Sequence, residues 1–155
     1  MRLRLYEEMT GHHEFTDGGG PAGRHPFAFR VGWGPERLRE WLDPRHPGFL
    51  WSDVAGEVRI GGLCEWTPCR GSLALEYLGA RRIRYAFDLE VEGTVYRYLG
   101  DKVNLRLWNL PVSHTTCFGV LTKRATGRLV STSVTRFHLR RLPRMLRRPA
   151  HWSVA

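Results

Sequence analysis

Residues 82–102, RIRYAFDLEVEGTVYRYLGDK, form the stretch that decides the fold class. Apolar and polar side chains alternate on both sides of Glu92-Gly93, with the period of two that is typical of β-strands. Glu92-Gly93 has the composition of a two-residue turn, which would pair Val91 with Thr94. The stretch therefore predicts an antiparallel hairpin with a defined register.

The charges of the hairpin support that register. It places Asp88 opposite Arg97 and Arg84 opposite Asp101, so two opposite-charge pairs fall on one face. The other face is apolar and aromatic except at its last position. On that face the register pairs Leu89 with Tyr96, Phe87 with Tyr98, Tyr85 with Gly100, and Ile83 with Lys102.

Lys102 is the informative residue, because the register points it toward the aromatic face. A lysine there needs a partner or a wet cavity, since an unpaired buried charge is very costly. Because glycine has no side chain, Gly100 would leave room beside Tyr85 for another group to approach closely. An interior lined by tyrosines and one cation suits an amphipathic organic ligand. The alternative, equally open, is a lysine at the mouth of a barrel that reaches water past its aromatic neighbours.

The rest of the chain follows the same pattern. Short alternating runs are separated by Gly and Pro turns every eight to twelve residues, which indicates an all-β fold of about eight to ten antiparallel strands. Pro35 opens a two-turn helix whose apolar face holds Leu38, Trp41 and Leu42. We expect a single β-barrel domain over residues 1–139, with one short helix, followed by a basic C-terminal tail at 140–155.

Composition narrows the class of protein. The chain has 155 residues, enough for one domain, and 42% of them are hydrophobic, so it can bury a core. No apolar run is long enough to span a bilayer, and the N-terminus has no apolar signal core. Three cysteines, Cys64, Cys69 and Cys117, have no metal-ligand spacing. We therefore expect reduced thiols and a cytoplasmic protein.

The net charge of +9 is concentrated in the C-terminal third, because residues 102–155 contain 11 basic side chains and no acidic one. Within it, the segment 136–148 combines arginines with leucines at near-helical spacing. It could dock on an anionic membrane surface, or its arginines could simply be solvated. No RNP-like frame of exposed aromatics is present, which disfavours nucleic acid as the partner.

Few other residues suggest chemistry. The seven histidines lack metal-ligand spacing, so no metal site is expected, and there is no Gly-x-Ser-x-Gly motif. Cys117 has the environment of a small buried hydrophobe rather than a nucleophile. Glu65 shares a face with Leu63 and is therefore a candidate interior carboxylate. If Glu65 met Lys102 across a cavity, the two would form an acid–base or binding pair.

Five short motifs follow one another along nearly the whole chain. They are Glu7-Glu8-Met9-Thr10-Gly11, Val54-Ala55-Gly56-Glu57-Val58, Gly71-Ser72-Leu73-Ala74-Leu75, Tyr98-Leu99-Gly100-Asp101-Lys102, and Leu107-Trp108 with Thr115-Thr116. In this order they resemble the small β-barrel domain found beside glucose–methanol–choline oxidoreductases of the cholesterol oxidase type. The resemblance implies a lipocalin-like barrel, similar in architecture to allene oxide cyclase and to the barrel cyclases of polyketide pathways.

Together these observations favour a cofactor-free cyclase or isomerase that holds a polyketide-, terpenoid- or sterol-like substrate in the barrel. The alternatives are a non-catalytic module that presents a lipophilic ligand to an oxidoreductase, and a basic surface binder of nucleic acid or membrane. The partner proteins left open are an oxidoreductase and a second copy of the chain. The candidate catalytic residues are Lys102, Tyr98, Tyr85 and Glu65, and the candidate substrate-binding residues are Tyr96, Phe87, Leu89, Trp108 and Trp66.

Overall fold

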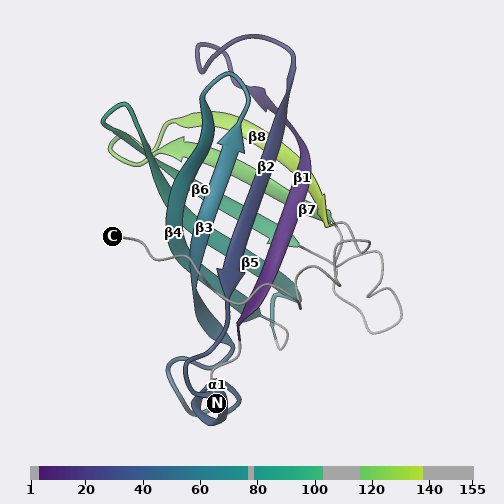
Figure 1. Ribbon diagram of the computed structural model, residues 1–155, viewed down its shortest axis with the longest axis vertical. Helices are drawn as coiled ribbons and strands as arrows, with labels where there is room; N and C mark the ends of the chain where they lie inside the picture. Colours follow the sequence, from purple (N-terminus) through teal and green to yellow (C-terminus); the bar gives the residue numbers. More distant parts are fainter. Residues whose placement is uncertain (1–3, 77–78, 103–115, 138–155) are drawn as a thin grey trace.

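A computed structural model describes residues 4–76, 79–102 and 116–137. In this part of the chain eight antiparallel strands form a closed barrel in sequence order, and the first strand pairs with the last (Figure 1). The predicted fold class, an all-β antiparallel barrel with one short helix, is confirmed. The elements are β1 (Leu5–Phe15), β2 (Arg24–Trp33), α1 (Leu38–Trp41), β3 (Trp51–Ile60), β4 (Cys64–Glu76), β5 (Arg82–Val91), β6 (Thr94–Lys102), β7 (Thr116–Lys123) and β8 (Leu129–Phe137).

The β5–β6 hairpin has the predicted register. Val91 pairs with Thr94, and Glu92 and Gly93 both have positive φ, as a two-residue turn of this kind requires. The two predicted ion pairs form on the outer face, where they make two hydrogen bonds each. Arg97 donates to Asp88 at 2.8 and 3.0 Å, and Arg84 donates to Asp101 at 2.8 and 2.7 Å.

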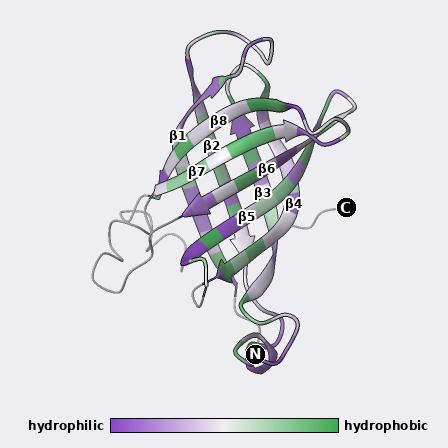
Figure 2. Cartoon of the chain, turned by 180° about the vertical axis from the view of Figure 1, so that it is seen from behind, coloured by the Kyte–Doolittle hydropathy of each residue, from purple (hydrophilic) through white to green (hydrophobic). Residues whose placement is uncertain are grey.

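Alternation along the strands places apolar residues inside the barrel and polar ones outside. Figure 2 shows hydrophilic and hydrophobic residues interleaved along the strands. Closure removes the exposed strand edges that an open sheet of this size would carry. The predicted barrel domain continues to Phe137 in β8, and the predicted tail at 140–155 lies outside the described residues.

Side chains fill the middle of the barrel. The ring centroid of Tyr98 lies 4.7 Å from that of Phe87 and 5.2 Å from that of Phe27. The ring of Tyr98 lies over two glycines, because a Cβ on Gly100 would come within 2.7 Å of it and a Cβ on Gly119 within 2.4 Å. The expectation that Gly100 leaves room for a ligand beside Tyr85 is therefore wrong, because Tyr98 occupies that space.

The barrel has two unlike ends. At the turn end, the connections 16–23, 61–63, 92–93 and 124–128 join consecutive strands. At the opposite end, which we call the Lys102 end, β1 begins and β6 and β8 finish. The segment 34–50, which contains α1, also lies there, beyond the barrel wall (Figure 1). The Lys102 end holds the candidate site.

Candidate functional site

Lys102 lies on the inner face of the barrel, as the hairpin register predicted, and only 4% of its surface is exposed. Its partner is Glu7, 8% exposed, near the start of β1. Because β1 is not adjacent to β5 or β6 in the sheet, the contact crosses the barrel. The Nζ of Lys102 donates a hydrogen bond to Oε1 of Glu7 and forms an ion pair with it.

Tyr85 completes the group, which we call the Glu7–Lys102–Tyr85 triad. Its hydroxyl donates to the second carboxylate oxygen of Glu7, Oε2, at 2.5 Å. The Nζ of Lys102 lies 5.2 Å from the centre of the Tyr85 ring and 5.7 Å from that of Phe137. Two donors thus converge on one buried carboxylate, beside aromatic rings that favour a cation.

The environment keeps the Tyr85 phenol protonated. Burial raises the pKa of Tyr85 well above its usual value, and the neighbouring charge of Glu7 raises it further. Tyr85 is therefore a hydrogen-bond donor that orients Glu7, and it is not a base at neutral pH. Of the three side chains, Lys102 and Glu7 form the ion pair.

The hydroxyl of Tyr98, a second candidate catalytic residue, contacts Ser133 and Cys117. It lies 3.4 Å from Ser133 Oγ and 3.8 Å from Cys117 Sγ. Burial raises the pKa of Tyr98 well above its usual value and that of the Cys117 thiol to about 12. Neither group is suited to nucleophilic or acid–base work at neutral pH.

The structure places three of the candidate substrate-binding residues inside the barrel. Phe87, Leu89 and Tyr96 are all buried. Leu89 and Tyr96 face each other near the turn end, six residues along β6 from Lys102, a distance of about 20 Å at the usual rise per strand residue. These two side chains therefore belong to the packed interior and do not line the triad.

Glu65 was a candidate interior carboxylate that would pair with Lys102 if the two met across a cavity, and the interior placement is wrong. The Glu65 side chain is 81% exposed and forms an ion pair with Arg59 at 3.0 Å. The cause is a β-bulge between Val58 and Ile60, which pairs Ile60 with Cys64. The extra residue gives Cys64 the inward position that uninterrupted alternation would have assigned to Glu65.

Two tryptophans were also predicted to contact substrate. The Trp66 ring lies on the outer surface, where the guanidinium carbon of Arg30 stands 4.1 Å from the ring centre. Arg30 itself pairs with Glu57 at 2.9 Å on that outer face. Trp66 therefore does not line the interior, and the prediction that it contacts a substrate inside the barrel is wrong. Trp108 lies outside the described residues.

Sequence reasoning missed Glu7, although a signal was present. In the first strand, Glu7 alternates in phase with the apolar residues Leu5 and Met9, as Lys102 does with Tyr98 in its own strand. Both charges therefore stood on core-facing positions of strands. The closure of the barrel is what brings the two strands face to face.

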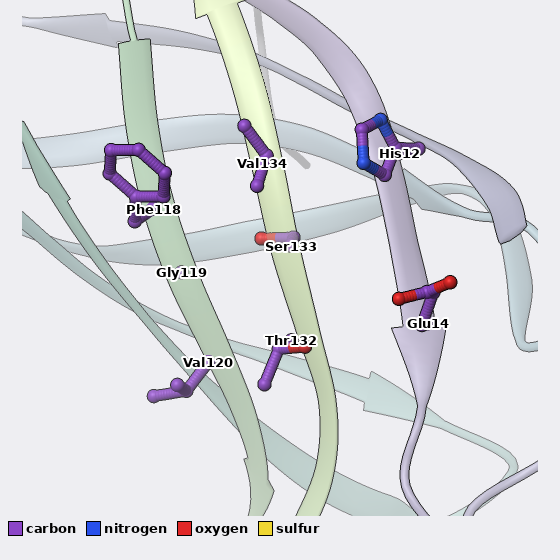
Figure 3. Close-up of a pocket in the computed structure, with 8 residues that line it drawn as sticks. All are labelled: His12, Glu14, Phe118, Gly119, Val120, Thr132, Ser133 and Val134. Carbon is purple, nitrogen blue, oxygen red and sulfur yellow. The ribbon is translucent and has the colours of Figure 1, made fainter.

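A hollow of about 370 Å³ lies elsewhere, on the outer wall across β1, β7 and β8 (Figure 3). Phe118 and Val120 project from β7, Val134 from β8, and His12 and Glu14 from β1. Its lining shares no residue with the triad. In the described part of the chain, no group of three or more His, Cys, Asp or Glu side chains could hold a metal ion.

The fold and the site define a class: a closed eight-stranded antiparallel barrel with a carboxylate–ammonium–phenol triad buried at one end. Comparisons with protein-family models, with curated proteins and with solved structures find no match for this chain. The resemblance to the oxidoreductase-associated barrels stays a prediction. Among the described residues, no helix is both long and apolar enough to cross a membrane.

Proposed function

We propose that this chain is a cofactor-free isomerase or cyclase that acts on a lipophilic carbonyl compound at the Lys102 end of the barrel. The observation that carries the proposal is the buried triad of Glu7, Lys102 and Tyr85 in an otherwise largely apolar interior. Polyketide-, terpenoid- and sterol-like molecules belong to the substrate class, since they combine a large apolar body with ketone or enone oxygens.

The chemistry assigns one role to each side chain. The Glu7 carboxylate removes a proton from the carbon next to the substrate carbonyl and returns it to another carbon. The Lys102 ammonium donates a hydrogen bond to the carbonyl oxygen, where negative charge develops. Tyr85 holds Glu7 in place through its hydrogen bond. Substrate and product are isomers, so the proton is conserved and no co-reactant is needed.

The net contribution of a buried ion pair to stability is small, so stability alone does not account for the pair of Glu7 and Lys102. Desolvating two charges offsets most of their attraction, and apolar replacements of buried pairs are often neutral or stabilising. The identity of the cation adds to this argument. The chain has 22 arginines and only two lysines, yet the buried base is a lysine. The lysine ammonium is a compact charge that suits a hydrogen bond to a single carbonyl oxygen, whereas the guanidinium of arginine is a planar fork that matches two acceptors.

The filled interior sets where the substrate would sit. Since Tyr98, Phe87 and Phe27 pack together in the middle of the barrel, the apolar body of the substrate would rest at the Lys102 end. This placement differs from the deep cavity expected from the hairpin alone.

Proton exchange in D2O tests the proposal. We would incubate the protein with a panel comprising a steroid enone, a terpenoid ketone and an aromatic polyketide, and follow deuterium incorporation by mass spectrometry. We expect deuterium incorporation into at least one compound. Glu7→Gln should slow this incorporation about a hundredfold, which is a typical contribution of a general base. Tyr85→Phe should slow it less, because it only orients Glu7.

The control is Asp88→Asn, which removes a carboxylate from an outer ion pair and should leave the exchange rate unchanged. Circular dichroism would confirm that each variant keeps the barrel. Equal rates in the wild type and in a folded Glu7→Gln variant would refute the proposal.

A second candidate rests on the same buried triad: a non-catalytic barrel that binds a lipophilic ligand at the Lys102 end and presents it to an oxidoreductase. Organic extraction of the purified protein followed by mass spectrometry would identify such a ligand. Tight binding of a compound that the wild type neither exchanges nor converts would support the carrier and exclude the enzyme, whereas binding that survives Lys102→Met while wild-type exchange is lost would exclude the carrier.

A further inference from the structure

Lys102 is one of only two lysines in the chain, and it is the one that lies buried inside the barrel. The other, Lys123, ends β7 and is partly exposed. A lysine amine can form a covalent bond with a carbonyl carbon, which the guanidinium of the 22 arginines does not do. A buried amine beside a carboxylate therefore has the parts of a covalent site.

The contacts of Lys102 provide what such a bond requires. The ammonium of a lysine must lose a proton before its nitrogen can attack a carbon, and Oε1 of Glu7 already accepts a hydrogen bond from Nζ. Tyr85 donates to Oε2 of Glu7 at 2.5 Å and so holds the carboxylate beside Nζ. The ring centres of Tyr85 and Phe137 lie 5.2 and 5.7 Å from Nζ, where they stabilise a cation.

We propose that Lys102 condenses with lipophilic aldehydes to form an iminium ion. Glu7 takes a proton from Nζ, the freed amine attacks the carbonyl carbon, and the carbonyl oxygen receives that proton. Glu7 then removes a second proton from the nitrogen and delivers it to the new hydroxyl group, which leaves as water while the C=N bond forms. The ammonium and the aldehyde thus become an iminium and water, and Glu7 ends as a carboxylate again.

Condensation keeps the buried charges balanced. The iminium carries the same single positive charge as the ammonium, so Glu7 keeps the cation with which it is paired. A neutral adduct would instead leave the carboxylate buried without a cation, which is strongly destabilising. The ion pair therefore favours aldehydes over acylating compounds, whose amide products are neutral.

The Lys102 end favours an aldehyde with a slender apolar body. In β1 the exposed fraction of inward-facing side chains rises toward that end, from 0% at Met9 to 8% at Glu7. In β5 it rises from 1% at Tyr85 to 7% at Ile83. Access is therefore narrow, and an aldehyde has one carbon substituent on its carbonyl where a ketone has two. Because Ile83 pairs directly with Lys102, its side chain offers apolar surface to an alkyl chain, and we expect linear alkanals to react.

Aldehyde capture goes beyond the proposed function, in which Lys102 stays an ammonium and only donates a hydrogen bond. It rests on the proposed function in one respect, namely that carbonyl compounds enter at the Lys102 end. It does not require Glu7 to remove a proton from carbon.

Reductive trapping with the full chain tests the inference. We would incubate the wild type with hexanal and sodium cyanoborohydride, which adds hydride to the iminium carbon and leaves a stable secondary amine. Mass spectrometry of the intact protein counts the hexyl groups, and peptide mapping assigns them to residues. We expect Lys102 to be modified about tenfold faster than Lys123 or more, because Glu7 serves Lys102 as a base.

The second lysine supplies the matched control. Lys102→Arg should abolish the adduct in the barrel while keeping a positive charge beside Glu7, whereas Lys123→Arg should leave that adduct unchanged. Glu7→Gln should slow modification of Lys102 about a hundredfold and leave that of Lys123 unchanged. In urea the two lysines should react equally, which shows that both peptides are detected. Modification of Lys102 no faster than that of Lys123 in the folded wild type would overturn the inference, and this comparison needs no variant to fold.

The two proposals for the triad can fail separately. Deuterium exchange of a ketone without trapping at Lys102 would keep the isomerase and remove the aldehyde site. Trapping of hexanal at Lys102 without deuterium exchange of any compound in the panel would keep the aldehyde site and remove the isomerase.

Discussion

Both ends of the barrel cover an apolar interior, but they do so with different chemistry. At the turn end, His13 lies fully buried between Phe15 and Phe27, with ring centroids 4.7 and 5.7 Å away. Its Nε2 lies 2.8 Å from the carbonyl oxygen of Gly61, and burial lowers its pKa. The turn end is therefore closed by the neutral imidazole of His13 packed against aromatic rings, which we call the neutral plug.

At the Lys102 end, the corresponding position is taken by an ion pair and a phenol. Glu7 and Lys102 are buried as charges, which costs desolvation that the turn end avoids. The same fold thus shows that a barrel of this size can be closed without buried charge. The triad is therefore an addition to what closure of the barrel requires, and this is the physical basis for proposing a function for it.

The largest effect should come from breaking the ion pair. Lys102→Met leaves the Glu7 carboxylate buried without its cation, and we expect a loss of about 3–5 kcal/mol in the free energy of unfolding. Urea denaturation followed by circular dichroism would measure it.

The double variant Glu7→Leu with Lys102→Met is the decisive companion. If the triad is not needed for closure, the double variant should unfold within about 1 kcal/mol of the wild type, or be more stable. A double variant as unstable as the single one would show that the charges hold the Lys102 end together, and the contrast between the two ends would lose its meaning.

A smaller loss of stability is expected from overpacking around Tyr98, which fills the middle of the barrel between the two ends. Gly119→Ala places a methyl group within 2.4 Å of the Tyr98 ring, and overpacking of this kind costs about 1–3 kcal/mol. Combining it with Tyr98→Leu should recover part of the loss, because the shorter side chain vacates the site. Gly79→Ala is the control, since no atom lies within 4 Å of its Cβ position. Equal stability of the Gly119 and Gly79 variants would mean that Tyr98 does not fill the barrel.

The neutral plug should make the turn end sensitive to acid. Burial lowers the pKa of His13 below its usual 6.5, so the unfolded chain takes up a proton at a higher pH than the native protein does. The stability gained from neutral His13 is complete above about pH 7 and is lost as the pH falls through the unfolded pKa toward the native one. His25 and His12, whose charges also lower the pKa of His13, act in the same direction.

His13→Gln tests this dependence, because glutamine can still donate to the Gly61 carbonyl but cannot titrate. We expect the free energy of unfolding of this variant to fall less than that of the wild type between about pH 7 and pH 5. An unchanged slope in His13→Gln would contradict the neutral plug.

The contrast between the ends also shows what could be predicted from the sequence. The hairpin register and the inward direction of Lys102 followed from local alternation, because opposed residues in a two-residue hairpin are set by the turn. The partner of Lys102 did not follow. Glu7 is 95 positions away, and only the pairing of β1 with β8 brings the two across from each other.

Two further errors have local causes that a pattern of alternation cannot reveal. The bulge between Val58 and Ile60 reversed the orientation expected for Glu65, because one extra residue shifts every side chain before it. The space over Gly100 looked open because the hairpin register shows only directly opposed residues. Tyr98, two positions earlier in the same strand, reaches along the face to cover Gly100.

The smallest effect should come from the outer ion pair of the same hairpin that carries Lys102. Arg84 and Asp101 are joined by two hydrogen bonds, yet their side chains are 35% and 25% exposed, so water and salt screen the pair. A double-mutant cycle with Arg84→Gln and Asp101→Asn should give a coupling of about 0.2–1 kcal/mol that shrinks in high salt. Because Arg82 lies 4.0 Å from Asp101, it will retain part of the attraction in the Arg84 variant. A coupling as large as that of Glu7 with Lys102 would mean that depth in the barrel does not distinguish the two pairs, and the Lys102 end would then have no special electrostatic character.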